Sequence, residues 1–171
     1  RGVNEGEQQV RSLPQSRKTA VDELAHLLPI RWGDIGQPLL DVAMAKFFRP
    51  GDFYSGYYRD QTFAFASGCA TIPEFFSQLY ADPDTENDPH SAGRQMNAHF
   101  ATQMVNENGQ WLPLSNHKNL AAGLAPTAGQ MPRSLGLAYA SKAFREIDAL
   151  QSLSDLSDKG DEVCFCTIGD A

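Results

Sequence analysis

The sequence predicts an α/β fold in which helices surround a parallel β-sheet. Residues 163–168 form a continuous apolar run, Val-Cys-Phe-Cys-Thr-Ile, which is typical of a strand buried on both faces. Several earlier segments repeat their apolar residues at helical spacing. A parallel strand needs neighbours that are joined to it by crossover helices. Because only one convincing strand is evident, we expect more strands beyond Ala171.

Five segments are expected to be helical. One covers residues 18–28 and ends before Pro29, and the next begins near Pro38, which suits the first turn of a helix. A short helix is expected at residues 62–67, another from Pro73 onward, and a long one at residues 127–144. The residues expected on buried faces are Leu39, Val42, Ala43, Met44 and Phe47, then Phe75, Phe76, Leu79 and Tyr80, and finally Ala128, Leu135, Gly136, Ala138 and Tyr139.

Two polar segments are expected to be long loops. Residues 82–98 hold four acidic residues and two prolines, and residues 106–119 combine Asn, Gly, Pro and Ser. The four carboxylates of the first loop repel one another, so we expect them to stay solvated. For the domain organisation, we expect an N-terminal arm and helix in residues 1–34 and one partial domain in residues 35–171.

Composition excludes several classes of protein. The chain has 171 residues and a net charge of −7, which argues against nonspecific nucleic-acid binding. No apolar run approaches the length of a transmembrane helix. Three cysteines are too few for a disulfide scaffold. They favour buried thiols in a reducing cytoplasm, and the spacing of Cys164 and Cys166 does not favour a metal site.

Short motifs occur in order along residues 35–171. They are Ile35-Gly36-Gln37, Arg49-Pro50-Gly51-Asp52 with Tyr57-Tyr58-Arg59-Asp60, Gly93-Arg94-Gln95-Met96 with His99, Gln130-Met131-Pro132 with Gly136, Ala138, Tyr139 and Ala140, and Gly169-Asp170-Ala171. Together they resemble the α subunit of the first, decarboxylating component of 2-oxo acid dehydrogenase complexes. The third motif is most similar to the branched-chain type.

The resemblance implies the front part of the diphosphate-binding domain of a thiamine-diphosphate-binding fold. Tyr58 and Arg59 would hold the cofactor diphosphate, for which a guanidinium fork and a phenol are suitable donors. The alternative for Arg59 is a surface salt bridge with Asp60. Ala125 and Thr127 would meet the aminopyrimidine ring of the cofactor through their backbone.

The last three residues resemble the start of the thiamine-diphosphate motif. Asp170 would be a ligand of Mg²⁺, a cation that prefers oxygen atoms, and Gly169 would let the backbone approach the diphosphate. Ala171 stands where the usual motif has a second Gly. A helix cap or a turn is the alternative for this triplet. The resemblance implies that the motif continues, and the chain is therefore expected to be truncated after Ala171.

Two further residues belong to the matching stretches. His99 is the candidate catalytic residue, and it either lines the site or transfers a proton. Arg94 either contacts the substrate or anchors the preceding loop.

The implied function is the oxidative decarboxylation of a 2-oxo acid, branched-chain or pyruvate, with acyl transfer to a lipoyl group. The protein supplies binding and orientation, while the cofactor carries the chemistry. The implied partners are a β-type subunit or domain with the pyrimidine-binding fold and a lipoyl-bearing acyltransferase, in an oligomeric assembly. The alternative is a catalytically silent fragment or binding module of the same fold. The chain alone is expected to be inactive.

Overall fold

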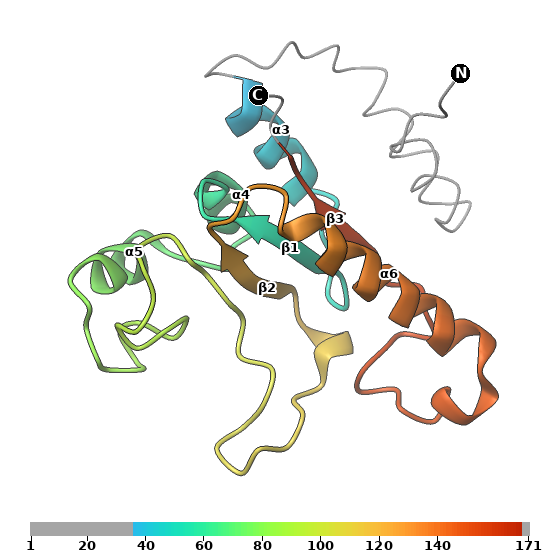
Figure 1. The fold of residues 1–171 in the computed structure, drawn as a ribbon. Helices are drawn as coiled ribbons and strands as arrows, with labels where there is room; N and C mark the ends of the chain where they lie inside the picture. The colour runs from blue at the N-terminus through green and yellow to red at the C-terminus, as the bar shows by residue number, and fades with distance from the viewer. Residues whose placement is uncertain (1–35, 169–171) are drawn as a thin grey trace.

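A parallel three-stranded sheet lies at the centre of the computed structural model, which describes residues 36–168 (Figure 1). β1 (Phe53–Tyr57) is the central strand, with β2 (Asn119–Leu124) on one side and β3 (Cys164–Cys166) on the other. Both outer strands run parallel to β1. The carboxyl ends of the three strands therefore lie at the same edge of the sheet.

The expectation of one evident strand is wrong, because β1 and β2 precede β3 in the chain. The sequences Phe-Tyr-Ser-Gly-Tyr and Asn-Leu-Ala-Ala-Gly-Leu contain Ser, Ala, Asn and Gly, most of which favour strands weakly. These segments become strands through pairing with their neighbours. Among the described strands β3 is an outer one, and its residues are half-buried, so its predicted burial on both faces is also wrong. Strands beyond Ala171 lie outside the described residues.

Four of the expected helices are present. They are α3 (Gly36–Ala45), α4 (Gln61–Ala66), α5 (Ile72–Leu79) and α6 (Gln130–Glu146), with short 3₁₀ helices at Leu114–Asn116 and Asp148–Leu150. A capping box starts α5, because the Thr71 side chain accepts from the Glu74 N–H and Glu74 accepts from the Thr71 N–H. The helix expected at residues 18–28 lies outside the described residues. Between residues 36 and 168, no helix has the length and apolarity needed to cross a membrane.

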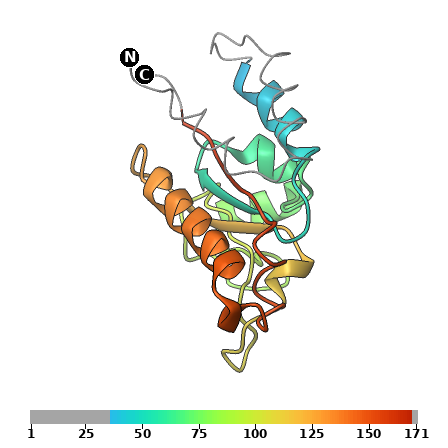
Figure 2. The ribbon, with the colours of Figure 1, turned by 90° about the vertical axis from the view of Figure 1, so that its right-hand side faces the viewer.

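The helices cover both faces of the sheet. α6 lies against one face, and α3 and α4 lie against the other (Figure 2). Adjacent residues of β1 reach these two layers: Tyr54 stacks on Phe63 of α4 with ring centroids 3.8 Å apart, and Ser55 donates to the backbone oxygen of Gln130. The main apolar core lies on the α4 side and contains Ala45, Phe48, Tyr54, Phe63, Ala64, Ala70, Ala98, Phe100 and Leu120.

The predicted buried face of α6 is wrong. Leu135 and Tyr139 are 71% and 72% exposed, whereas Gln130, Ser134 and Ser141 are buried. Polar side chains can be buried here because each donates a hydrogen bond to a backbone oxygen, in α6 itself or in the chain on either side of β3. Gly136 and Ala138 are also exposed, and Ala128 is half-buried.

The faces of α3 and α5 differ from the prediction in the same way. Leu39, Val42 and Phe47 are exposed, while Asp41, Ala45 and Phe48 are buried. In α5 and at its end, Phe76, Leu79 and Tyr80 are exposed, Gln78 is buried, and Phe75 packs partly against the core. Ala43 and Met44 are half-buried. Helical spacing therefore predicts the helices correctly but not the face that each turns inward.

The loop at residues 82–98 contains a fully buried carboxylate, contrary to the expectation of solvation. Asp88 is 0% exposed. Its carboxylate accepts hydrogen bonds from the N–H groups of His90, Ser91 and Gly93 and from the Ser91 hydroxyl. Burial alone would raise the pKa of Asp88, but these hydrogen bonds lower it below the usual value. The expected loop at residues 106–119 is confirmed except for its 3₁₀ turn and the start of β2.

Phe63 and Phe76 provide a test of the core. Phe63 is 0% exposed and Phe76 is 48% exposed. We expect Phe63→Ala to lower the free energy of unfolding by about 3–5 kcal/mol, the usual cost of truncating a buried Phe. Phe76→Ala, the matched control, should cost less than about 1 kcal/mol. Urea denaturation of both variants measures this, and equal midpoints would contradict the described core.

Candidate functional site

The predicted cofactor-binding residues follow the carboxyl ends of the three strands. Tyr58 and Arg59 come directly after β1, and Ala125 and Thr127 come after β2. Residues 169–171 follow β3 in the sequence but lie outside the described part of the chain. Ligands of open α/β sheets bind at this edge. The parallel topology thus brings the two described segments to the same edge of the sheet.

Tyr58 and Arg59 form a pair of donors at this edge. The Arg59 Nε donates to the Tyr58 hydroxyl at 3.0 Å, and the guanidinium carbon lies 5.4 Å from the ring centroid. This hydrogen bond lowers the pKa of the Tyr58 phenol. Arg59 is exposed and forms no ion pair within residues 36–168, so the alternative of a salt bridge with Asp60 is wrong. An exposed guanidinium beside a phenol is a donor set that fits a diphosphate.

His99 lies beside this pair. Its ring is stacked on that of Tyr58, with centroids 5.9 Å apart and planes inclined by 7°. The His99 Nδ1 is 3.0 Å from the backbone oxygen of Met96, and the residue is buried. The structure therefore brings His99, Tyr58 and Arg59 together. Arg94 is exposed, and among the described residues its side chain has no ion pair.

The turn after β2 approaches the turn after β1. The Tyr58 N–H donates to the backbone oxygen of Leu124 at 3.1 Å, which joins the two strand ends. Ala125 is half-buried and Thr127 is exposed. Ala128 adopts the left-handed conformation, with φ of 63°, which is uncommon for a residue other than glycine. This turn leads directly into α6.

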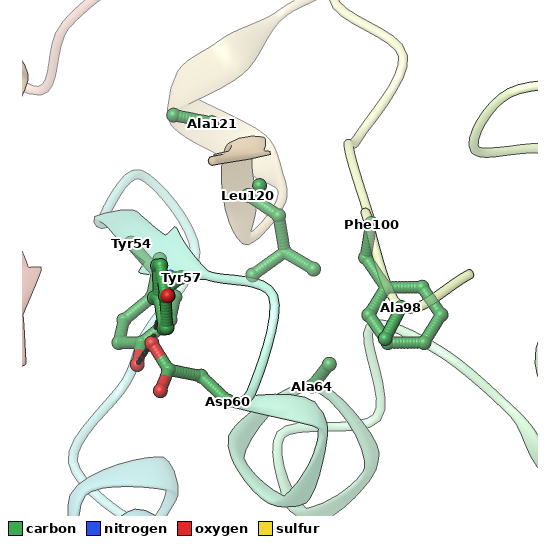
Figure 3. Close-up of a pocket in the computed structure, with 10 residues that line it drawn as sticks. Tyr54, Tyr57, Asp60, Ala64, Ala98, Phe100, Leu120 and Ala121 are labelled. Atoms are coloured by element: carbon green, nitrogen blue, oxygen red, sulfur yellow. Dashed lines mark hydrogen bonds between the residues drawn. The ribbon is translucent and has the colours of Figure 1, made fainter. Parts of the chain in front are cut away.

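A cavity of about 20 Å³ lies below the edge, between the sheet, α4 and the segment that carries His99. Figure 3 shows Asp60 beside Tyr54 and Tyr57 on one side of it, with Phe100 on the opposite side. The cavity has room for about one water molecule. A cofactor therefore does not fit inside it, and the outer surface of the strand edge is the candidate binding surface.

Asp60 is a buried residue beside the candidate site whose environment the sequence does not predict. It is 5% exposed, and its Oδ2 accepts hydrogen bonds from the Tyr57 N–H, the Tyr54 hydroxyl and the Thr167 hydroxyl. From the sequence alone, Asp60 is considered only as a salt-bridge partner of Arg59. The available signal was its position at the start of a helix, directly after the predicted diphosphate-binding pair.

A second buried carboxyl group, that of Asp41 on α3, lies near Asp60. Asp41 is 1% exposed and its Oδ1 has no hydrogen-bond partner. Burial, and secondly the charge of Asp60, raises the pKa of Asp41 to about 7.

The three cysteines are free and half-buried rather than fully buried. Burial raises the pKa of Cys69, Cys164 and Cys166, and that of Cys164 reaches about 12. The Cys166 sulfur lies 3.5 Å from the sulfur of Met131. Within residues 36–168, no three His, Cys, Asp or Glu side chains are grouped so that they could hold a metal ion.

A family model described as the dehydrogenase E1 component matches residues 28–171. The chain belongs to this family. Dehydrogenase E1 components are thiamine-diphosphate-dependent and work with other subunits in 2-oxo acid dehydrogenase complexes. The parallel sheet with helices on both faces agrees with the thiamine-diphosphate-binding fold of E1 components. Comparison with curated proteins gave no match, and comparison with solved structures gave none either.

Asp41 makes the stability of this E1 component depend on pH. Because its pKa in the folded state is about 7, above the usual 3.8, the folded chain binds the proton more tightly than the unfolded chain. The contribution of Asp41 to the free energy of unfolding is complete below about pH 4. It falls by about 1.4 kcal/mol per pH unit as the pH rises toward 7. Asp41→Asn should remove this contribution, which denaturation at pH 5, 6 and 7 measures. A variant with the same pH dependence as the parent would contradict the assignment.

Proposed function

We propose that this E1 component binds thiamine diphosphate and Mg²⁺ at the carboxyl edge of its sheet and takes part in the oxidative decarboxylation of a 2-oxo acid. One observation carries the proposal. The residues that resemble the cofactor-binding segments follow three adjacent parallel strands, although they are far apart in the sequence. The acyl product passes to a lipoyl group. We propose a branched-chain 2-oxo acid as the substrate, with pyruvate as the alternative.

Each candidate residue has a proposed role in binding. Arg59 and Tyr58 bind the diphosphate through charge-assisted and phenolic hydrogen bonds. The backbone of Ala125 and Thr127 contacts the aminopyrimidine ring. His99 is the proposed catalytic residue on the substrate side, and its stacking on Tyr58 supports a position next to the bound cofactor. Bound thiamine diphosphate supplies the electron sink for decarboxylation.

The segment after β3 supplies the proposed metal ligand. Asp170 is proposed to coordinate Mg²⁺ through its carboxylate, because Mg²⁺ is bound by one or two carboxylates together with phosphate oxygens. Gly169 and Ala171 are proposed to bring their backbone close to the diphosphate.

The proposed partners are a β-type subunit with the pyrimidine-binding fold and a lipoyl-bearing acyltransferase. The exposed apolar residues Leu135 and Tyr139 on α6, and Ile72 and Leu79 on α5, support contacts between subunits, because large exposed apolar areas mark interaction surfaces. We propose an oligomeric assembly in the cytoplasm, which the free cysteines favour.

Arg59→Ala tests the proposed site. In the assembled protein, this change should weaken binding of thiamine diphosphate by about tenfold or more, because the diphosphate loses a charge-assisted hydrogen-bond donor. Isothermal titration calorimetry in the presence of Mg²⁺ measures the affinity. Arg49→Ala is the matched control: Arg49 is also exposed but pairs with Asp161 at 3.2 Å, before β1 begins. The affinity of the Arg49→Ala variant for thiamine diphosphate should be unchanged.

The results separate the proposed enzyme from its alternative. Equal affinities of the Arg59→Ala and Arg49→Ala variants would reject the diphosphate assignment. Absence of cofactor binding in the parent protein would favour a silent binding module. Release of CO₂ from branched-chain 2-oxo acids and from pyruvate by the assembled protein identifies the substrate. We expect no release from the 171-residue chain by itself.

A further inference from the structure

Gln78 of α5 places a buried side-chain amide beside the candidate site. The residue is 2% exposed, and its Nε2 donates to the His99 backbone oxygen at 3.1 Å and to the Ser91 hydroxyl at 3.4 Å. Its Oε1 is also buried and has no hydrogen-bond partner among the described residues. A buried oxygen without a partner costs free energy. Because a methionine of similar length would fill the space without that cost, packing alone does not account for an amide at this position.

The backbone of His99 is held between α5 and β2. On the β2 side, the Gly123 N–H donates to the Phe100 backbone oxygen at 3.0 Å. A Cβ atom at Gly123 would lie 3.2 Å from the His99 Cα, so a side chain there would push His99 away. On the α5 side, Gln78 bonds to the His99 carbonyl. The preceding residue, Ala98, is left-handed with φ of 65°, a conformation that persists where surrounding contacts enforce it.

The two ring nitrogens of His99 have different environments. Nδ1 lies 3.0 Å from the Met96 backbone oxygen, and it carries a proton because a carbonyl oxygen can only accept a hydrogen bond. Nε2 has no hydrogen-bond partner within residues 36–168. Unlike Nε2 of His90 and both ring nitrogens of His117, it is not an enclosed atom. Nε2 is therefore the ring nitrogen of His99 that can take up or release a proton.

We propose that Gln78 is a positioning residue for His99: its amide holds the His99 carbonyl so that the ring stacks on Tyr58 and Nε2 stays accessible. Gln78 itself contacts neither cofactor nor substrate. The catalytic role of His99 belongs to the proposed function, on which this inference rests. Proton transfer is efficient when the imidazole nitrogen is held within hydrogen-bond reach of the reacting group. The contact with Gln78 restricts the backbone from which that imidazole projects.

Gln78→Met removes the amide donor and keeps the length of the side chain. It also removes the unpaired oxygen, so the thermal midpoint should change little. Gln130→Met is the matched control. Gln130 is also 2% exposed, its Nε2 donates to the Thr167 backbone oxygen at 2.8 Å, and its Oε1 has no partner in the described part of the chain. That hydrogen bond joins α6 to the end of β3 and does not involve His99.

Diethyl pyrocarbonate, which acylates accessible uncharged imidazole nitrogens, reports on His99 without any cofactor. The assembled protein is treated with it, and peptide mass spectrometry gives the rate at each histidine. In the parent, His99 should react faster than His90 and His117, whose ring nitrogens are enclosed or hydrogen-bonded. Gln78→Met should speed the reaction of His99 by up to about tenfold, the effect of one lost hydrogen bond on local opening. Gln130→Met should leave this rate unchanged.

Steady-state decarboxylation separates positioning from folding. With a 2-oxo acid as substrate, Gln78→Met should lower kcat by about tenfold, while KM and the Kd for thiamine diphosphate stay at the parental values. Gly123→Ala displaces His99 from the opposite side and should lower kcat in the same way. A purely structural role would lower the thermal midpoint instead and would not divide the effect between kcat and KM.

Parental kcat together with parental reactivity of His99 in Gln78→Met would overturn the positioning role. An equal change of His99 reactivity in Gln130→Met would overturn it as well. In the parent, bound thiamine diphosphate should slow acylation of His99, because the cofactor covers the strand edge. If Gln78→Met alters the acylation of His99, but thiamine diphosphate gives no protection and the parent releases no CO₂, the positioning of His99 stands and the proposed function fails.

Discussion

The register of the parallel strands is the constraint on which the rest of the structure depends. Phe53 lies opposite Asn119 in one neighbour and Cys164 in the other, so the three strands begin at the same level. Asp52, which precedes β1, holds the starts of both neighbouring strands in register. Its Oδ1 accepts from the Val163 N–H at 2.8 Å, and its backbone oxygen accepts from the Asn119 N–H at 3.0 Å. Asp52 and Asn119 are almost fully buried, and hydrogen bonds shielded from water are stronger. Because the strands start together and are short, their opposite ends also meet, and residues separated by more than one hundred positions become neighbours.

The sequence predicts the helices and one strand, because these depend on local features such as apolar spacing, Pro38 and Pro73 at helix starts, and the continuous run at residues 163–168. It does not predict β1 and β2, in which Ser, Ala and Gly give a weak local signal and pairing supplies the structure. The inward faces of the helices also depend on tertiary contacts. In α6, Gln130 and Ser141 are buried because backbone oxygens near β3 accept their hydrogen bonds, and no property of the helix alone reveals those acceptors.

For the candidate site too, the sequence predicts some residues and does not predict the tertiary contacts of others. The motifs place Tyr58, Arg59 and His99 in one site, and the structure brings these three side chains together. The burial of the Asp60 carboxylate is not apparent from the sequence, because its partner Thr167 is distant in the chain and becomes adjacent only through the parallel register. An Arg followed by an Asp suggests a surface ion pair, yet the two side chains point to different environments: the guanidinium to solvent and the carboxylate to the interior.

The half-buried thiols of Cys164 and Cys166 have a chemical consequence for β3. Only the thiolate form of cysteine attacks a disulfide or an alkylating reagent. With a pKa of about 12 for Cys164 and a raised pKa for Cys166, both groups remain protonated at neutral pH and are poor nucleophiles. In this position each cysteine behaves as a small apolar residue that fills space beside β1 and α6, and it resists oxidants and alkylating reagents at neutral pH.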